Sequence, residues 1–155
     1  MILAMLLSFL WASAPGGAGS EPVAFPRTDL TIVGNDGTRH SFTVEVARSP
    51  AQRSRGLMYR AHLAPDAGML FVYPSPQRAR MWMKDTPVSL DMLFLAGDGK
   101  VLEIEERTEP LSMATIASTA PVRGVLELRG GRCAELGIAP GARVLHEAFG
   151  ETAQP

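Results

Sequence analysis

Basic residues are concentrated in one part of a chain that is otherwise close to neutral. Between Arg48 and Lys84 there are seven Lys or Arg residues and one acid, Asp66, whereas the formal net charge of all 155 residues is -1. Guanidinium groups bind carboxylates and phosphates through paired hydrogen bonds, and a lysine adds a point charge. This part of the chain therefore predicts a surface that binds a small anion.

The same region supplies residues that suit other parts of a ligand. Gly56 and Gly68 let backbone come close to it, and Trp82 can stack on a sugar ring or another planar group. A carboxylate such as Asp91 accepts hydrogen bonds from hydroxyls. We therefore expect a non-enzymatic pocket for a small anionic or sugar-like, polyhydroxylated ligand. The predicted ligand-binding residues are Arg53, Gly56, Arg60, Gly68, Trp82, Lys84 and Asp91.

Two other interpretations of these charges stay open. The cations can form structural ion pairs with Asp85, Asp91 or Glu127, or lie on a solvated face. Alternatively, Asp85 and Asp91, on either side of Pro87, can act as the acid and base of a hydrolase or transferase. Such an enzyme would be of an unfamiliar type, because no G-x-S-x-G, H-E-x-x-H, P-loop or dinucleotide motif occurs.

A metal site is a weaker alternative. Met81 and Met83 flank Trp82, and thioether sulfur favours Cu(I), so periplasmic Cu(I) binding is one hypothesis. Methionine also packs well in irregular cores. The three histidines, His40, His62 and His146, lack ligand spacing, and no Cys/His cluster suits zinc. We therefore predict no metal and no cofactor.

Composition favours one globular domain. The chain has 46% hydrophobic and 20% charged residues, which suits an ordinary core. Its near-zero net charge argues against a general nucleic-acid binder, which carries a clear basic excess. The single cysteine, Cys133, excludes a disulfide within the chain and is expected to be a buried, unreactive thiol.

The amino terminus resembles an export signal. An apolar run from Ile2 to Ala12, interrupted only by Ser8, is followed by Ala12-Ser13-Ala14 and a Gly-rich linker, a pattern typical of a cleaved signal peptide. The run is too short for a stable membrane span. Since no Lys or Arg precedes it, either the terminal amine supplies the positive charge or the true start lies upstream. We expect a signal and linker over 1–20, one domain over 21–150, a tail over 151–155, and a periplasmic or secreted protein.

Turn signals and alternating apolar residues predict the elements that position these side chains. Alternation on both sides of Asn35-Asp36-Gly37 indicates a hairpin, and Gly97-Asp98-Gly99 indicates a second. Ser49-Pro50-Ala51-Gln52 is a capping box for a short helix that stops at Gly56. Another helical turn is expected over 132–136, ending at Gly137. Strands are expected over 69–73, ended by Pro74 and Pro76, and over 78–84, 88–95, 101–105, 122–128 and 144–149.

If residues 78–84 form a strand, Met81 and Met83 share one face, and Trp82 and Lys84 share the other. Many short strands with one or two short helices predict a mainly β domain. A small closed or nearly closed barrel or sandwich limits its exposed edges.

Separated motifs give the chain a family resemblance. Arg53-x-x-Gly56-Leu57-Met58-x-Arg60, then Gly68-Met69-Leu70-Phe71, then Trp82-Met83-Lys84-Asp85-Thr86 with Leu90-Asp91 resemble the DUF192 family, also called UPF0127, as do Val125-Leu126-Glu127-Leu128 and Gly137-Ile138-x-x-Gly141. The resemblance implies a compact, mainly β domain of unestablished activity, often behind a signal peptide. Two residues depart from the usual pattern: Met81 stands for Phe, which argues against a metal ligand there, and Asp85 stands for Asn.

Overall fold

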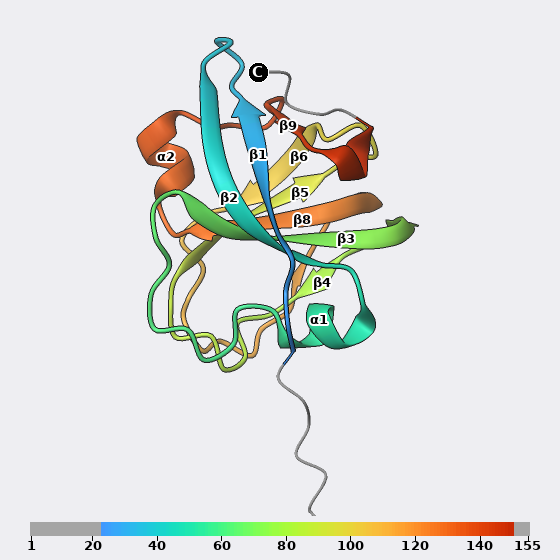
Figure 1. Cartoon of the computed structure of the whole chain (residues 1–155). Coiled ribbons are helices and arrows are strands. Elements are labelled where there is room, and N and C mark those ends of the chain that lie inside the picture. The colour runs from blue at the N-terminus through green and yellow to red at the C-terminus, as the bar shows by residue number, and fades with distance from the viewer. Residues whose placement is uncertain (1–22, 151–155) are drawn as a thin grey trace, which may run out of the picture.

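The computed structural model describes residues 23–150, so the predicted signal peptide and the tail lie outside the described residues. Two short α-helices, one 3₁₀ turn and nine strands form this part of the chain (Figure 1). None of its helices has the length and apolar character of a membrane span. In chain order the elements are β1 (Arg27–Val33), β2 (Arg39–Ala47), α1 (Pro50–Arg55), β3 (Ala67–Gln77), β4 (Arg80–Met81), β5 (Leu90–Leu95), β6 (Val101–Glu105), β7 (Ile116–Ala117), β8 (Val122–Arg129), α2 (Arg132–Leu136), β9 (Arg143–Leu145) and η1 (Glu147–Phe149).

Seven of the strands form one curled sheet in the order β6-β5-β8-β3-β2-β1-β9. Its two outermost strands meet, because Lys100 bridges to Arg143 and the Val101 N–H donates to the Ala142 carbonyl at 2.8 Å. Gly99, with φ +80°, makes this closure possible, since a Cβ there would collide with the Val144 carbonyl. The sheet is thus a nearly closed barrel, and the mainly β prediction is confirmed.

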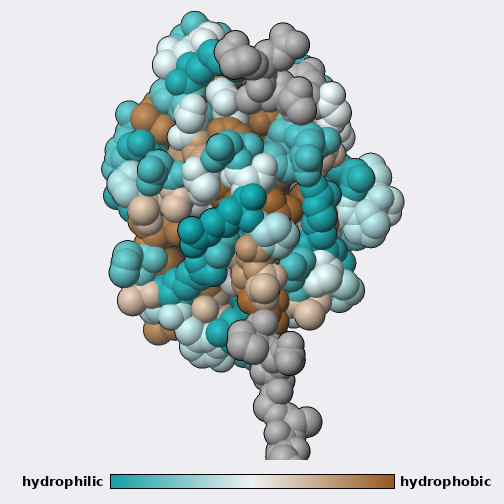
Figure 2. All heavy atoms as spheres, viewed as in Figure 1, coloured by the Kyte–Doolittle hydropathy of each residue, from teal (hydrophilic) through white to brown (hydrophobic). Residues whose placement is uncertain are grey.

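Both faces of the central strands are buried, because alternate side chains enter two different apolar clusters. In β5, Leu93 and Leu95 belong to the first cluster, which fills the curled sheet. Leu90, Met92 and Phe94 belong to the second cluster. That second face is covered by the loop after α1 and by the segment that contains β4, which lie beneath β3 in Figure 1. Figure 2 shows hydrophilic residues over much of one face of the molecule, with apolar residues between them.

The local signals for α1 act as predicted. The Ser49 side chain accepts from the Gln52 N–H at 3.1 Å, and the Gln52 side chain accepts from the Ser49 N–H at 3.0 Å. Gly56, with φ 47°, ends the helix. Both predicted hairpins form, and α2 ends at Gly137 as expected.

Three details of the predicted strands are wrong. β3 continues through Pro74 and Pro76 to Gln77, because its pairing with β8 shifts register after Val72 and the bulge tolerates residues without an N–H. β4 is only two residues long, so Met81 and Met83 do not share a strand face. The last strand stops at Leu145, and a 3₁₀ turn follows it.

Candidate functional site

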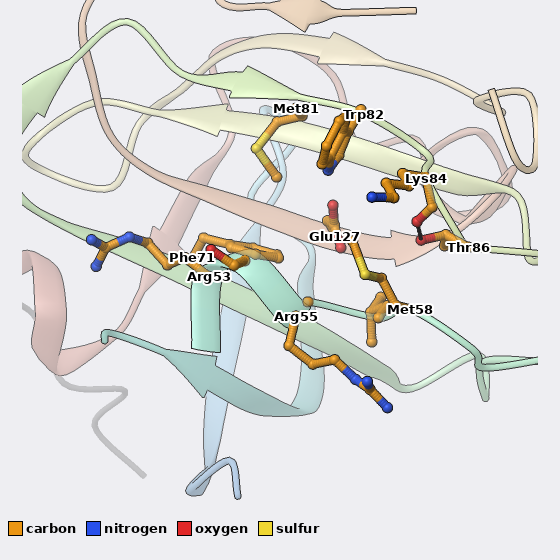
Figure 3. A pocket seen from close by; sticks show the side chains of 12 residues that line it. Arg53, Arg55, Met58, Phe71, Met81, Trp82, Lys84, Thr86 and Glu127 are labelled. Atoms are coloured by element: carbon orange, nitrogen blue, oxygen red, sulfur yellow. Dashed lines mark hydrogen bonds between the residues drawn. The ribbon is translucent and has the colours of Figure 1, made fainter. Parts of the chain in front are cut away.

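A narrow hollow, here called the Glu127 pocket, lies between the end of α1, the segment after β4, and the β3–β8 pair (Figure 3). Its cavity volume is about 30 Å³, which is room for one functional group. Four of the predicted ligand-binding residues line it, namely Arg53, Gly56, Trp82 and Lys84. The structure therefore brings together side chains from two distant parts of the chain.

Glu127 is the one acidic residue of the described chain that lines this pocket. The residue is 4% exposed, and on β8 it stands between Met69 of β3 and Met92 of β5. Alternation places it on the same face as Val125, which is in the second apolar cluster. Among residues 23–150 it has no hydrogen-bond donor or ion-pair partner, and burial alone raises the pKa of its carboxyl to about 8.

Lys84 and Trp82 form the opposite wall. Trp82 is 47% exposed, and the Lys84 Nζ lies 5.2 Å from the centre of its ring, within cation–π range. Figure 3 shows the Lys84 ammonium directed toward the space in front of the Glu127 carboxylate. Between them in the chain, Met83 is fully buried and its N–H donates to the Ser112 carbonyl at 3.0 Å, which anchors this segment.

Backbone in the left-handed region is concentrated beside this wall. Tyr59, Asp85 and Leu111 have φ of 66°, 52° and 63°. The loops that carry them are joined, since the Tyr59 N–H donates to the Asp85 carbonyl at 2.6 Å and the Leu111 N–H to the Thr86 carbonyl at 3.0 Å. Non-glycine residues held in this region cost free energy and are common at functional sites. The loops therefore hold the Lys84 turn in a defined position.

A wider hollow, here called the basic groove, adjoins the Glu127 pocket, and the two share five lining residues: Arg53, Ser54, Phe71, Met81 and Trp82. The cavity volume of this groove is about 480 Å³. Its cations are Arg53, Arg78 and Arg80, and no Asp or Glu is among its lining residues. The Arg53 guanidinium lies 5.8 Å from the Tyr73 ring centre and donates to the Arg48 carbonyl. The lining of the groove itself is therefore positively charged.

Arg60 and Gly68, two other predicted residues, lie elsewhere. Arg60 pairs with Glu45 at 2.6 Å, and both residues line a separate hollow together with Gly68. Gly68 serves strand packing, because a Cβ there would be 2.5 Å from the Glu127 carbonyl oxygen. The structural ion-pair interpretation thus holds for Arg60, although its partner is not one of the predicted acids.

The seventh predicted residue, Asp91, is fully buried and occupied. Its carboxylate accepts from the backbone N–H groups of Arg107, Gly131 and Cys133 at 2.8, 2.9 and 2.8 Å. Asp85 instead accepts from the Tyr59 hydroxyl at 3.1 Å. The two carboxylates share no hydrogen-bond partner in the part of the chain that the structure describes.

The two methionine sulfurs of the copper hypothesis are also separated. Met81 lines the Glu127 pocket and accepts weakly from the Tyr73 hydroxyl at 3.6 Å, whereas buried Met83 accepts from the Thr108 hydroxyl at 3.2 Å. The described residues include no group of three or more His, Cys, Asp or Glu that could hold a metal ion. Cys133 is buried, as expected, and burial raises the pKa of its thiol.

Comparison with known proteins agrees with this architecture. The DUF192 family, described as Uncharacterized ACR, COG1430, matches residues 31–146. The chain belongs to the DUF192 family. A Sinorhizobium meliloti 1021 protein described as a candidate transcription regulator is 42% identical, with a TM-score of 0.80 over 82% of this chain and 98% of its own. A Novosphingobium aromaticivorans DSM 12444 protein of unknown function is 35% identical, with a TM-score of 0.76 over 87% of this chain and 94% of its own.

None of the curated proteins matches this DUF192 chain. Its motif residues have different roles in the structure. Trp82 and Lys84 line the pocket, Asp91 ties loops together, and Glu127 lies at the pocket floor. From the sequence, Glu127 is expected only to be an ion-pair partner of the cations. The burial of Glu127 could have been predicted, because this acid stands within an otherwise apolar strand at a position whose side chain faces the core.

Proposed function

We propose that this DUF192 protein binds a small organic anion, with the anionic group at the mouth of the Glu127 pocket and the remainder in the basic groove. The observation that supports this most is the unbalanced charge of the two hollows. Arg53, Arg78, Arg80 and Lys84 line them, and among residues 23–150 none of the four forms an ion pair with a carboxylate. Because like charges repel, these four cations destabilise one another, and no carboxylate of the described residues pairs with them. A bound anion would offset that repulsion.

The shape of the two hollows limits the ligand. The Glu127 pocket takes one functional group, whereas the groove takes a larger body. The exposed ring of Trp82 borders both hollows and suits stacking on a planar group. A polyhydroxylated ligand is less favoured, because Asp91, the predicted hydroxyl acceptor, already accepts three backbone hydrogen bonds.

Matched ligands and matched variants test the proposal. Calorimetric titration should show that benzoate binds more tightly than benzamide, its neutral analogue, and phenyl phosphate and glucose complete the panel. Lys84→Gln should weaken benzoate binding at least about tenfold, since charge-assisted contacts contribute roughly 1.5–3 kcal/mol.

Arg60→Gln is the control, because it removes an arginine that lines a different hollow and pairs with Glu45. It should leave benzoate affinity unchanged. Three results would overturn the proposal: no anion of the panel binding at millimolar concentration, benzamide binding as well as benzoate, or Arg60→Gln weakening binding as much as Lys84→Gln. Tighter binding of glucose would favour the polyhydroxylated ligand instead.

A further inference from the structure

The basic residues explain why an anion would come to this site, but they leave the acid at its floor unexplained. A carboxylate among cations ordinarily pairs with one of them. Here the Lys84 ammonium is directed toward the same space, yet it makes no ion pair with Glu127. The residues paired with Glu127 on the neighbouring strands are Met69 and Met92. The strands on either side therefore place thioethers, and no charged group, directly beside Glu127.

We propose that Glu127 binds the anion as a neutral carboxylic acid, donating its proton in a hydrogen bond to an oxygen of a carboxylate, phosphate or sulfonate ligand. This inference rests on the proposed function and adds the protonation state of Glu127 in the complex with the anion. A carboxylic acid has one O–H donor, whereas a carboxylate has none and would repel an anion. The ligand class is therefore an oxyanion that takes one hydrogen bond from the pocket floor and further contacts from the cations at the rim.

The groups that face Glu127 fit this assignment. Among the cations that line the pocket, the Lys84 ammonium is directed toward Glu127, whereas the Arg53 guanidinium donates to the Arg48 carbonyl and the Arg55 guanidinium lies over the Tyr59 ring. On β3, burial raises the pKa of Tyr73 to about 12, with a smaller contribution from Glu127, so that this phenol stays neutral. Since burial also raises the pKa of the Glu127 carboxyl to about 8, the acid form predominates at pH 7 without any ligand.

Proton linkage tests the inference. The probe is benzoate, a carboxylate that stays ionised between pH 7 and pH 9.5. Its affinity for the wild-type protein should fall with rising pH, approaching tenfold per pH unit above about pH 8. Calorimetry at pH 8 in buffers of different ionisation enthalpy should show about half a proton taken up per benzoate bound.

Glu127→Gln retains an N–H donor but does not titrate. It should bind benzoate with no proton uptake and with the same affinity at pH 7 and pH 9. Proton release by the wild-type protein, or a pH dependence that Glu127→Gln leaves intact, would overturn the inference while benzoate binding itself would still support the proposed function. Whether protons are taken up or released on benzoate binding is measured on the wild-type protein, so the test remains valid even if the variant folds poorly. If neither benzoate nor phenyl phosphate binds to either protein, both proposals are overturned.

Discussion

Replacing Glu127 by glutamine should stabilise the folded protein at neutral pH, although it alters a buried residue. The carboxyl has an ordinary pKa of 4.5 and a pKa of about 8 in the fold, where burial penalises its charged form. Below pH 4.5 the group is protonated in both states and has no linked cost. As the pH rises, the unfolded chain loses this proton while the folded chain keeps it, so stability falls until the folded group also ionises near pH 8.

The size of the stability change follows from the difference between the ordinary pKa of 4.5 and the pKa of about 8 in the fold. One pKa unit corresponds to about 1.4 kcal/mol, so the wild-type protein should lose roughly 4 kcal/mol from this group between pH 5 and pH 8. Glutamine has nearly the same shape and does not titrate. The free energy of unfolding of Glu127→Gln minus that of the wild type should therefore increase by about this amount over the same range and level off above pH 8.

Urea denaturation at pH 5, 6, 7 and 8 measures the difference, and other titrating groups cancel because both proteins contain them. Glu105→Gln is the matched control. Glu105 stands opposite Met92 on β6, as Glu127 does on β8, but it is exposed. Its replacement should shift stability by less than about 0.5 kcal/mol at every pH. Parallel stability curves for wild type and Glu127→Gln would refute the assigned desolvation.

Two further predictions concern residues that the structure moves from binding to packing. Asp91→Asn should cost roughly 2–4 kcal/mol in urea denaturation, because an amide replaces an oxygen that accepts buried backbone N–H groups; unchanged stability would contradict that role. Gly68→Ala should cost about 1–3 kcal/mol, since its Cβ would be 2.5 Å from the Glu127 carbonyl oxygen. Gly97→Ala, where nothing lies within 4 Å, should cost much less, and equal losses would refute the packing argument.

The parts of the fold that could be predicted are those that short-range signals determine. The capping box at Ser49 and the turn at Gly99 depend on a few consecutive residues, and both form as expected. The course of β3 beyond Val72 could not be predicted, because a bulge against β8, some fifty residues away along the chain, accommodates its prolines.

Prediction of the site was limited for the same reason. Charge clustering selects Arg53 and Lys84, which line one pocket, but it also selects Arg60, whose partner Glu45 is identified only by the tertiary structure. Asp91 accepts from amides 40 and 42 residues away, contacts that no local pattern contains. Spacing along the chain indicates which residues can do chemistry, whereas the partners that already occupy them become apparent only in the folded structure.

Three of the chain's own acids show why Glu127 is the residue on which function should depend. Glu45 is partly buried and has Arg60 at 2.6 Å, and fully buried Asp91 has three backbone N–H groups within 2.9 Å. The fold thus compensates buried carboxylates where they hold it together. Glu127 is nearly as buried as Asp91, borders a hollow with cations, and has no such partner in residues 23–150. If a bound anion supplies that partner, ligand and proton should stabilise the protein together. The stabilisation by benzoate should then be larger at pH 7 than at pH 9, and Glu127→Gln should remove that difference.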